Sequence, residues 1–171
     1  MKNATNGDNA PKIHHEKLYN GDIKMYGKEI KKILVSREEI AKRVAELGKQ
    51  ISEDYKGESV TLVCTLRGAS IFFADLVREI EGDVEIDFIA VSSYGAGTKS
   101  SGEVKMIKDL SEPIKDKNVI IVEDIIDSGL TMKYLRQLFS ARNPASITTI
   151  SFLDKEDCHS ESLKTDLCGF T

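Results

Sequence analysis

Polar side chains gather directly after one short apolar run in the second half of the chain. The run, Val119–Val122, has the four consecutive aliphatic residues of a strand that is buried on both faces. Glu123 and Asp124 follow it, and Asp127-Ser128-Gly129-Leu130-Thr131 then leads into a stretch with helical spacing. Hydroxyl groups, a glycine and the N–H groups at a helix start together suit one phosphate group. The two carboxylates suit ribose hydroxyls, or a Mg²⁺ ion shared with a second phosphate.

The same residues have simpler interpretations when each is taken alone. Asp127 or Ser128 can cap a helix, and Glu123 and Asp124 can be solvated charges. Two adjacent acids at the end of a buried strand lower stability unless they bind a ligand, and this favours a site for ribose and phosphate. The order E-D-x-x-D-S-G-x-T resembles the phosphoribosyl-diphosphate signature of the type I phosphoribosyltransferases. It is most similar to the signature of the hypoxanthine(-guanine) phosphoribosyltransferases.

A second candidate stretch is Leu66-Arg67-Gly68-Ala69, which lies between an apolar run and a helical pattern. A lone arginine at a strand end is usually a solvated charge. Gly68, however, permits close approach of the backbone, and a helix start beside Arg67 favours a diphosphate. The stretch resembles the pyrophosphate loop of the same family, in which the bond before the basic residue is a non-proline cis peptide. We therefore expect a cis bond between Leu66 and Arg67, and pyrophosphate bound by Arg67 and Gly68.

Lys155 is the third candidate, at the end of the run Ser151–Leu153. A surface lysine is usually just a solvated charge. By resemblance, Leu153-Asp154-Lys155 is the family's purine segment, in which the lysine contacts the exocyclic 6-oxygen. An ammonium group only donates hydrogen bonds, so it suits a 6-oxo purine and discriminates against the 6-amino group of adenine. Asp166-Leu167-Cys168-Gly169-Phe170 also resembles the family's D-x-x-G-F.

The stretch Tyr94–Gly102 is rich in Gly, Ser, Thr and Lys, which predicts a long flexible hairpin loop. It only superficially resembles a nucleotide-binding loop. Thr98 stands where a P-loop requires glycine, and Ser100 replaces the last glycine of the dinucleotide fingerprint. In the resembling family, a loop that opens with Ser-Tyr, as Ser93-Tyr94 does here, closes over the site and excludes water. The alternative is a hairpin tip without a role.

The resemblance implies transfer of a phosphoribosyl group from phosphoribosyl diphosphate to N9 of hypoxanthine or guanine, giving IMP or GMP and pyrophosphate. It assigns the 5′-phosphate to residues 127–131, with Asp127 as the catalytic base toward purine N7. Glu123 and Asp124 are the expected ligands of the ribose hydroxyls, directly or through Mg²⁺, which is the expected cofactor. The implied partners are small-molecule substrates and further copies of the chain, as a homodimer or homotetramer.

Two departures from the family pattern leave alternatives open. His159 stands where the family usually has arginine, four residues after Lys155. The family also continues beyond Gly169-Phe170 into a segment that covers the purine, so we expect the domain that ends at Thr171 to lack this cover. One alternative is a nucleotide-sensing regulator without catalysis. The other is a phosphoribosyltransferase for another base, such as xanthine or orotate.

These motifs require elements that bring them to one place. Apolar residues at positions 40, 44, 47 and 51 predict a first helix, and helical spacing recurs over 69–80 and 130–141. Apolar runs at 59–66, 84–93, 119–122 and 147–153 predict strands, and residues 103–110 predict a strand that returns from the hairpin loop. This alternation predicts an α/β fold, with an open, mostly parallel sheet flanked by helices on both faces. Ligands bind such sheets at the carboxyl ends of the strands, where the three candidate stretches fall.

Composition restricts the remaining possibilities. The chain has 171 residues with 24 Lys+Arg and 28 Asp+Glu, and this net charge of −4 disfavours a nucleic-acid-binding protein. No stretch approaches the roughly 20 apolar residues of a membrane span. Three scattered cysteines form neither a disulfide framework nor a metal motif, which indicates a cytoplasmic protein. We expect a disordered polar tail over residues 1–12 and a single domain over residues 13–171.

Overall fold

The computed structural model describes residues 32–93, 104–159 and 165–171. The chain divides into two units, Met1–Ser36 and Arg37–Thr171, and the second unit contains the fold described below. The tail expected over residues 1–12 lies outside the described residues, as does the hairpin loop that begins at Tyr94. None of the helices in the described ranges is both long and apolar enough to cross a bilayer.

The second unit alternates helices and strands along the chain. Its elements are α1 (Arg37–Asp54), β1 (Ser59–Leu66), α2 (Ser70–Arg78), β2 (Asp83–Ser93), β3 (Val104–Lys108), β4 (Asn118–Ile126), α3 (Leu130–Ser140), β5 (Ser146–Asp154), the short 3-10 helix η4 (Glu156–Cys158) and β6 (Leu167–Phe170). Every helix and strand expected from the sequence is present. The sequence pattern did not predict η4 and β6, and it ended β4 four residues too early.

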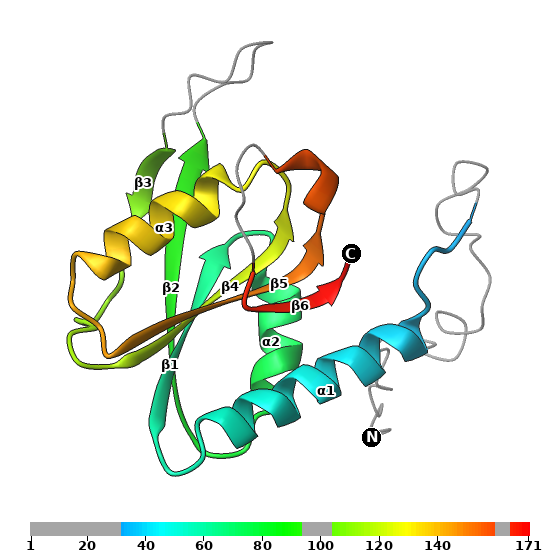
Figure 1. Cartoon of the computed structure of the whole chain (residues 1–171), viewed down its shortest axis with the longest axis horizontal. Coiled ribbons are helices and arrows are strands. Elements are labelled where there is room, and N and C mark those ends of the chain that lie inside the picture. The colour runs from blue at the N-terminus through cyan, green and yellow to red at the C-terminus, as the bar shows by residue number, and fades with distance from the viewer. Residues whose placement is uncertain (1–31, 94–103, 160–164) are drawn as a thin grey trace, which may run out of the picture. The chain divides into compact units, whose positions relative to one another are not determined.

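The strands form one sheet in the order β3-β2-β1-β4-β5-β6 (Figure 1). The four pairings from β2 through to β6 are parallel, and β2 pairs with β3 as an antiparallel hairpin. The open, mostly parallel sheet predicted from the sequence is therefore confirmed. In this order β1, β4 and β5 lie side by side and point the same way, so their carboxyl ends form one edge.

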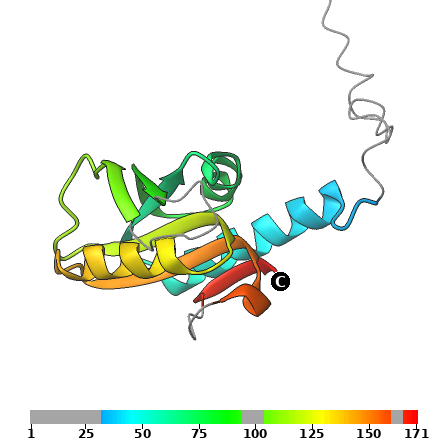
Figure 2. The same ribbon diagram turned by 90° about the horizontal axis from the view of Figure 1, so that it is seen from above.

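Both faces of the sheet are covered by helices (Figure 2), as expected. On one face α1 and α2 pack against alternate residues of the central strands, among them Leu62 of β1 and Ile120 of β4. On the other face α3 packs against the residues next to these, Val63 and Ile121. Because β1 and the segment Val119–Val122 of β4 are buried on both faces, their residues are mostly apolar or β-branched and do not alternate between apolar and charged.

Candidate active site at the carboxyl ends of the central strands

The three candidate stretches meet at the edge formed by the ends of β1, β4 and β5. Arg67 and Gly68 follow β1, the segment Asp127–Thr131 connects β4 to α3, and Lys155 follows β5. Because these strands are neighbours in the sheet, residues nearly ninety positions apart in sequence reach the same place. The expectation that the stretches form one site is consistent with this arrangement.

Glu123 and Asp124 lie inside β4 and not after it, which corrects the expectation from the sequence. The ladder between β4 and β5 continues past the apolar run, pairing Glu123 with Ser151 and Ile126 with Asp154. Glu123 is consequently buried, with 8% of its surface exposed, whereas Asp124 is partly exposed. Both carboxylates are thus held by sheet hydrogen bonding rather than by a loop.

The buried carboxyl group of Glu123 has an unusual environment. Burial raises its pKa from 4.5 to about 8, and the adjacent Asp124 carboxyl contributes to the increase. Its Oε1 accepts a hydrogen bond from the Asp124 N–H at 3.3 Å. Its Oε2, like the Thr65 hydroxyl, is buried without a hydrogen-bond partner in the described residues. The Thr65 side chain lies near enough to lower the pKa of the Glu123 carboxyl, although the two atoms do not meet in hydrogen-bond geometry. Buried polar atoms rarely lack partners, so these two neighbouring atoms suit a ligand or an ion.

The carboxylate pair suits a Mg²⁺ ion that a substrate helps to hold. Within the ranges that the structure describes, no three potential ligands come together as a complete metal site. Mg²⁺, however, is often held by only one or two carboxylates, with water and substrate oxygens completing its shell. Glu123 and Asp124, with one unpaired oxygen between them, fit that donor set.

Gly68 lies directly against Asp124. A Cβ atom at Gly68 would overlap the Oδ2 of Asp124 and come within 2.7 Å of its Cγ, so a larger residue would displace the Asp124 carboxylate. The Leu66–Arg67 peptide bond is cis, as predicted. The Ser70 hydroxyl donates to the carbonyl oxygen of Arg67 at 2.8 Å, while the arginine side chain is exposed. The loop after β1 therefore presents a cation and a bare backbone beside the acidic pair.

The segment between β4 and α3 has the geometry expected of an anion cradle. Gly129 occupies the N-cap position of α3 with a φ of 79°, a left-handed conformation that favours glycine. The N-cap position is taken by Gly129, without a side-chain cap hydrogen bond, so the alternative in which Asp127 or Ser128 occupies that position is wrong. Asp127 and Ser128 are exposed, and Leu130 and Thr131 form the first turn, which contains no acidic residue. The N–H groups of that turn have no intrahelical partners, and they suit a phosphate.

Lys155 and Asp127 lie together at the mouth of the site. The Lys155 Nζ is 3.5 Å from the Asp127 Oδ1, and both side chains are more than half exposed. The Lys155 N–H donates to the carbonyl oxygen of Ile126 at 2.9 Å, which ties the end of β5 to the end of β4. The expected purine contact and the expected base are thus adjacent. Of the expected loop pair, Ser93 is the last residue of β2, and Tyr94 lies outside the described residues.

The sequence analysis names Asp154 as part of the purine segment and His159 as a departure from the family pattern, but it does not predict that these residues meet near this edge, and it does not single out Thr165. Asp154, His159 and Thr165 form a buried cluster beside Lys155. No spacing pattern indicates this cluster, because its members come from the end of β5, the residue after η4 and a segment before β6. The D-x-x-G-F stretch has a structural explanation: the Asp166 carboxylate accepts hydrogen bonds from the Thr149 N–H and hydroxyl, and so fixes the start of β6.

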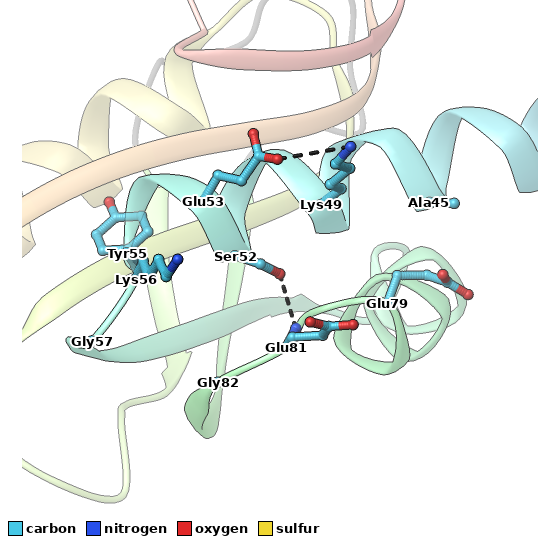
Figure 3. A pocket seen from close by; sticks show the side chains of 10 residues that line it. All are labelled: Ala45, Lys49, Ser52, Glu53, Tyr55, Lys56, Gly57, Glu79, Glu81 and Gly82. Carbon is cyan, nitrogen blue, oxygen red and sulfur yellow. Dashed lines mark hydrogen bonds and ion pairs between the residues drawn. The ribbon is translucent and has the colours of Figure 1, made fainter.

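A pocket of about 600 Å³ lies at the other end of the sheet (Figure 3). Its lining comes from the end of α1 and the turns that precede β1 and β2, at the amino ends of these strands. Lys49 pairs with Glu53 at 3.8 Å, and the Ser52 hydroxyl accepts from the Glu81 N–H at 2.9 Å. This pocket lies away from the carboxyl ends of the strands, where ligands bind sheets of this kind, and none of the three candidate stretches lines it.

Comparisons with known proteins agree with the site at the strand ends. The family described as phosphoribosyl transferase domain matches residues 32–171. The hypoxanthine-guanine phosphoribosyltransferases of Streptococcus thermophilus and Bacillus subtilis are each 45% identical over 142 residues, which are 83% of this chain and 79% of theirs. A Bacillus anthracis hypoxanthine-guanine phosphoribosyltransferase structure is 44% identical with a TM-score of 0.78, covering 83% of this chain and 84% of that one. A Staphylococcus aureus hypoxanthine phosphoribosyltransferase is 36% identical with a TM-score of 0.81, covering 85% and 79%. The chain belongs to the phosphoribosyl transferase domain family, among its hypoxanthine-guanine phosphoribosyltransferases.

Proposed function

We propose that this protein is a purine salvage enzyme that transfers phosphoribosyl from phosphoribosyl diphosphate to N9 of hypoxanthine or guanine. The products are IMP or GMP and pyrophosphate. One observation carries the proposal: residues suited to phosphate, ribose, pyrophosphate and a 6-oxo purine lie at adjacent strand ends of one sheet. The family to which the chain belongs supports the same reaction.

The sugar phosphate would lie across β4 and the start of α3. We assign the 5′-phosphate to Asp127–Thr131, where α3 begins and where the segment includes the hydroxyl side chains of Ser128 and Thr131. Glu123 and Asp124 would hold the ribose hydroxyls together with Mg²⁺. The diphosphate would extend toward Arg67 and Gly68, because the Gly68 backbone already touches Asp124.

The purine would lie against Asp127 and Lys155. A 6-oxo purine has its O6 and N7 atoms on one edge, and the two side chains lie 3.5 Å apart at one edge of the site. The Lys155 ammonium group would donate to O6. The Asp127 carboxylate would accept the proton that leaves N7 as N9 forms its bond to the ribose C1′, while the C1′–oxygen bond breaks and pyrophosphate leaves.

Positive charge develops on the ribose ring as the C1′–oxygen bond breaks. The carboxylate of Asp124, fixed in β4 beneath the expected ribose position, would stabilise this charge electrostatically. Glu123 and Asp124 would hold Mg²⁺, which when bound would supply positive charge near the leaving pyrophosphate. Arg67 would supply a second positive charge to the same leaving group.

A cytoplasmic location and assembly into a homodimer or homotetramer are further parts of the proposal. The three cysteines, Cys64, Cys158 and Cys168, are all free thiols, which is consistent with a reducing compartment. Cell fractionation tests the location. Sedimentation of the purified protein over a range of concentrations tests the assembly, and a monomer at every concentration would contradict it.

The direct test is an assay of nucleotide formation. The full chain is incubated with phosphoribosyl diphosphate and Mg²⁺ and, separately, with hypoxanthine, guanine, xanthine, orotate or adenine. We expect IMP and GMP, with adenine as the poor substrate because Lys155 cannot accept from its amino group. Product only with xanthine or orotate would identify a different phosphoribosyltransferase. No product with any base would favour the regulator alternative.

A further inference from the structure

Three buried polar side chains meet behind Lys155. The His159 Nε2 lies 2.6 Å from the Oδ1 of Asp154, and the Thr165 hydroxyl donates to the Oδ2 of the same carboxylate at 2.7 Å. The Asp154 and His159 side chains are only 3% and 9% exposed. Asp154 is the last residue of β5, His159 follows η4, and Thr165 precedes β6, so the cluster joins three segments.

Burying a carboxylate lowers the stability of the folded protein unless both of its oxygens have polar or charged neighbours. In this cluster the Oδ2 of Asp154 accepts the hydrogen bond from Thr165, whereas its Oδ1 lies 2.6 Å from the His159 Nε2 and neither of these two facing atoms has a hydrogen-bond partner within the described residues. The close approach of the imidazole is therefore the only contact that the described residues offer to the Oδ1 of this buried carboxylate. The contact between Asp154 and His159 also closes a turn. Within it the Cys158 N–H donates to the Lys155 carbonyl oxygen at 2.8 Å, and the His159 N–H donates to that of Glu156 at 3.3 Å.

Lys155 is the first residue of this turn. Its N–H is held by the carbonyl oxygen of Ile126 and its carbonyl oxygen by the N–H of Cys158, so its backbone is fixed on both sides. Its side chain is exposed and extends to Asp127. The buried cluster therefore sets the position from which the ammonium group reaches the mouth of the site.

We propose that His159 is a positioning residue for the purine site, which acts through Asp154 to hold the turn that presents Lys155. This inference rests on the proposed function, because the readout is recognition of a 6-oxo purine. An arginine at position 159, which is the usual residue of the resembling family, can donate to the same carboxylate. The pairing with Asp154, rather than the imidazole ring as such, is what positions Lys155.

The test compares the two substrates of the enzyme. In His159→Ala we expect the KM for hypoxanthine to rise about tenfold, as for a misplaced hydrogen-bond donor. The KM for phosphoribosyl diphosphate should change by less than about twofold. His159→Arg should restore the hypoxanthine KM to within about threefold of the original value. Thr165→Val, which removes the other partner of Asp154 with little change of volume, should shift the hypoxanthine KM in the same direction.

Arg142→Gln is the matched control for a merely structural loss. It breaks the two 2.8 Å contacts between Arg142 and Asp109, near the amino end of β5. It should lower the melting temperature and leave the ratio of the KM for hypoxanthine to the KM for phosphoribosyl diphosphate unchanged. Equal increases in both KM values for His159→Ala, or a melting change alone as in the control, would overturn the proposal.

Hydrogen exchange separates this proposal from the proposed function. If the original chain forms no nucleotide from hypoxanthine or guanine, the proposed function fails, and the positioning claim is decided by exchange alone. The Lys155 and Cys158 amides should exchange faster in His159→Ala than in the original chain or in Arg142→Gln, because both amides donate within or beside the turn. Unchanged exchange at these two amides would overturn the positioning role.

Discussion

Asp127 is the residue whose chemistry is most open to direct test. Its carboxylate is exposed at the mouth of the site, beside Lys155, so its removal disturbs no buried packing. We expect Asp127→Ala to lower kcat by roughly 10²–10⁴-fold, the range for loss of a general base. Binding of phosphoribosyl diphosphate, measured by calorimetry, should be largely retained. Asp75→Ala removes a carboxylate that pairs with Arg78 on the surface of α2 and serves as the control. An unchanged kcat would refute the assignment of the base.

The buried carboxyl group of Glu123 should make the free energy of unfolding depend on pH. Burial raises the pKa of this carboxyl from 4.5 to about 8, so the folded protein retains a proton that the unfolded chain releases above pH 4.5. Between about pH 4.5 and about pH 8 the folded state thus binds more protons, and the stability contributed by this group decreases as the pH rises. Glu123→Gln should remove that decrease, and the variant should exceed the original chain in free energy of unfolding at about pH 9.

Urea denaturation of the ligand-free protein at about pH 5 and about pH 9 measures this difference. Glu53→Gln, which alters an exposed carboxylate of α1, provides the comparison. If Glu123→Gln and the original chain lose stability in parallel over the whole range, the buried carboxyl is not the cause.

At the scale of elements, the start of α3 depends on one backbone conformation. Gly129 has a φ of 79°, and a left-handed conformation costs other residues roughly 1–2 kcal/mol. Gly129→Ala should therefore lower the free energy of unfolding by about that amount and raise the KM for phosphoribosyl diphosphate. Gly57→Ala is a close control, because Gly57 has a φ of 84° with open space around it and lies before β1. It should lose similar stability and leave the KM unchanged, and equal KM values in both variants would contradict the phosphate cradle.

The elements that sequence predicts well are those with strong periodicity. The apolar stripe of α1 can be buried only against a sheet face, and the apolar run of β1 only beneath helices. Both elements lie where the sequence predicts them. The extent of β4 was not predictable, because its last residues include two acids that only the ladder to β5 keeps in a strand. The strand β6 has four residues and no alternation, so it is defined by the Asp166 anchor and pairing with β5 rather than by local sequence.

The candidate site shows the same division. Each motif is a short continuous stretch of the sequence, so the phosphate, diphosphate and purine stretches could be proposed before any fold was known. The contact of Gly68 with Asp124 and that of Lys155 with Asp127 depend on the order β1-β4-β5, which no single stretch encodes. The cluster around Asp154 was missed for a similar reason, since it requires that residues after η4 fold back onto β5.

At the scale of the whole molecule, the domain boundaries expected from the sequence yield a deletion test. Residues 1–12 are polar and Asn-rich, and the family match begins only at residue 32. We propose that a chain lacking residues 1–12 keeps its melting temperature and its kcat/KM for hypoxanthine. Thermal denaturation and the nucleotide assay measure both. A large loss of either would place part of this segment inside the functional domain.

The two helix layers share one sheet, and this predicts cooperative unfolding of the unit Arg37–Thr171. Leu76 of α2 and Leu135 of α3 are both fully buried, in separate apolar clusters on opposite faces. The central strands β1 and β4 supply side chains to both clusters, so neither layer can lose its packing without exposing residues of the same strands. Leu76→Ala and Leu135→Ala should each lower the free energy of unfolding by about 2–5 kcal/mol. In urea, far-UV circular dichroism and tyrosine fluorescence should still give one coincident transition for each variant. Two separate transitions in either variant would mean that the faces unfold independently, and that the strand-end site can persist on a partly unfolded molecule.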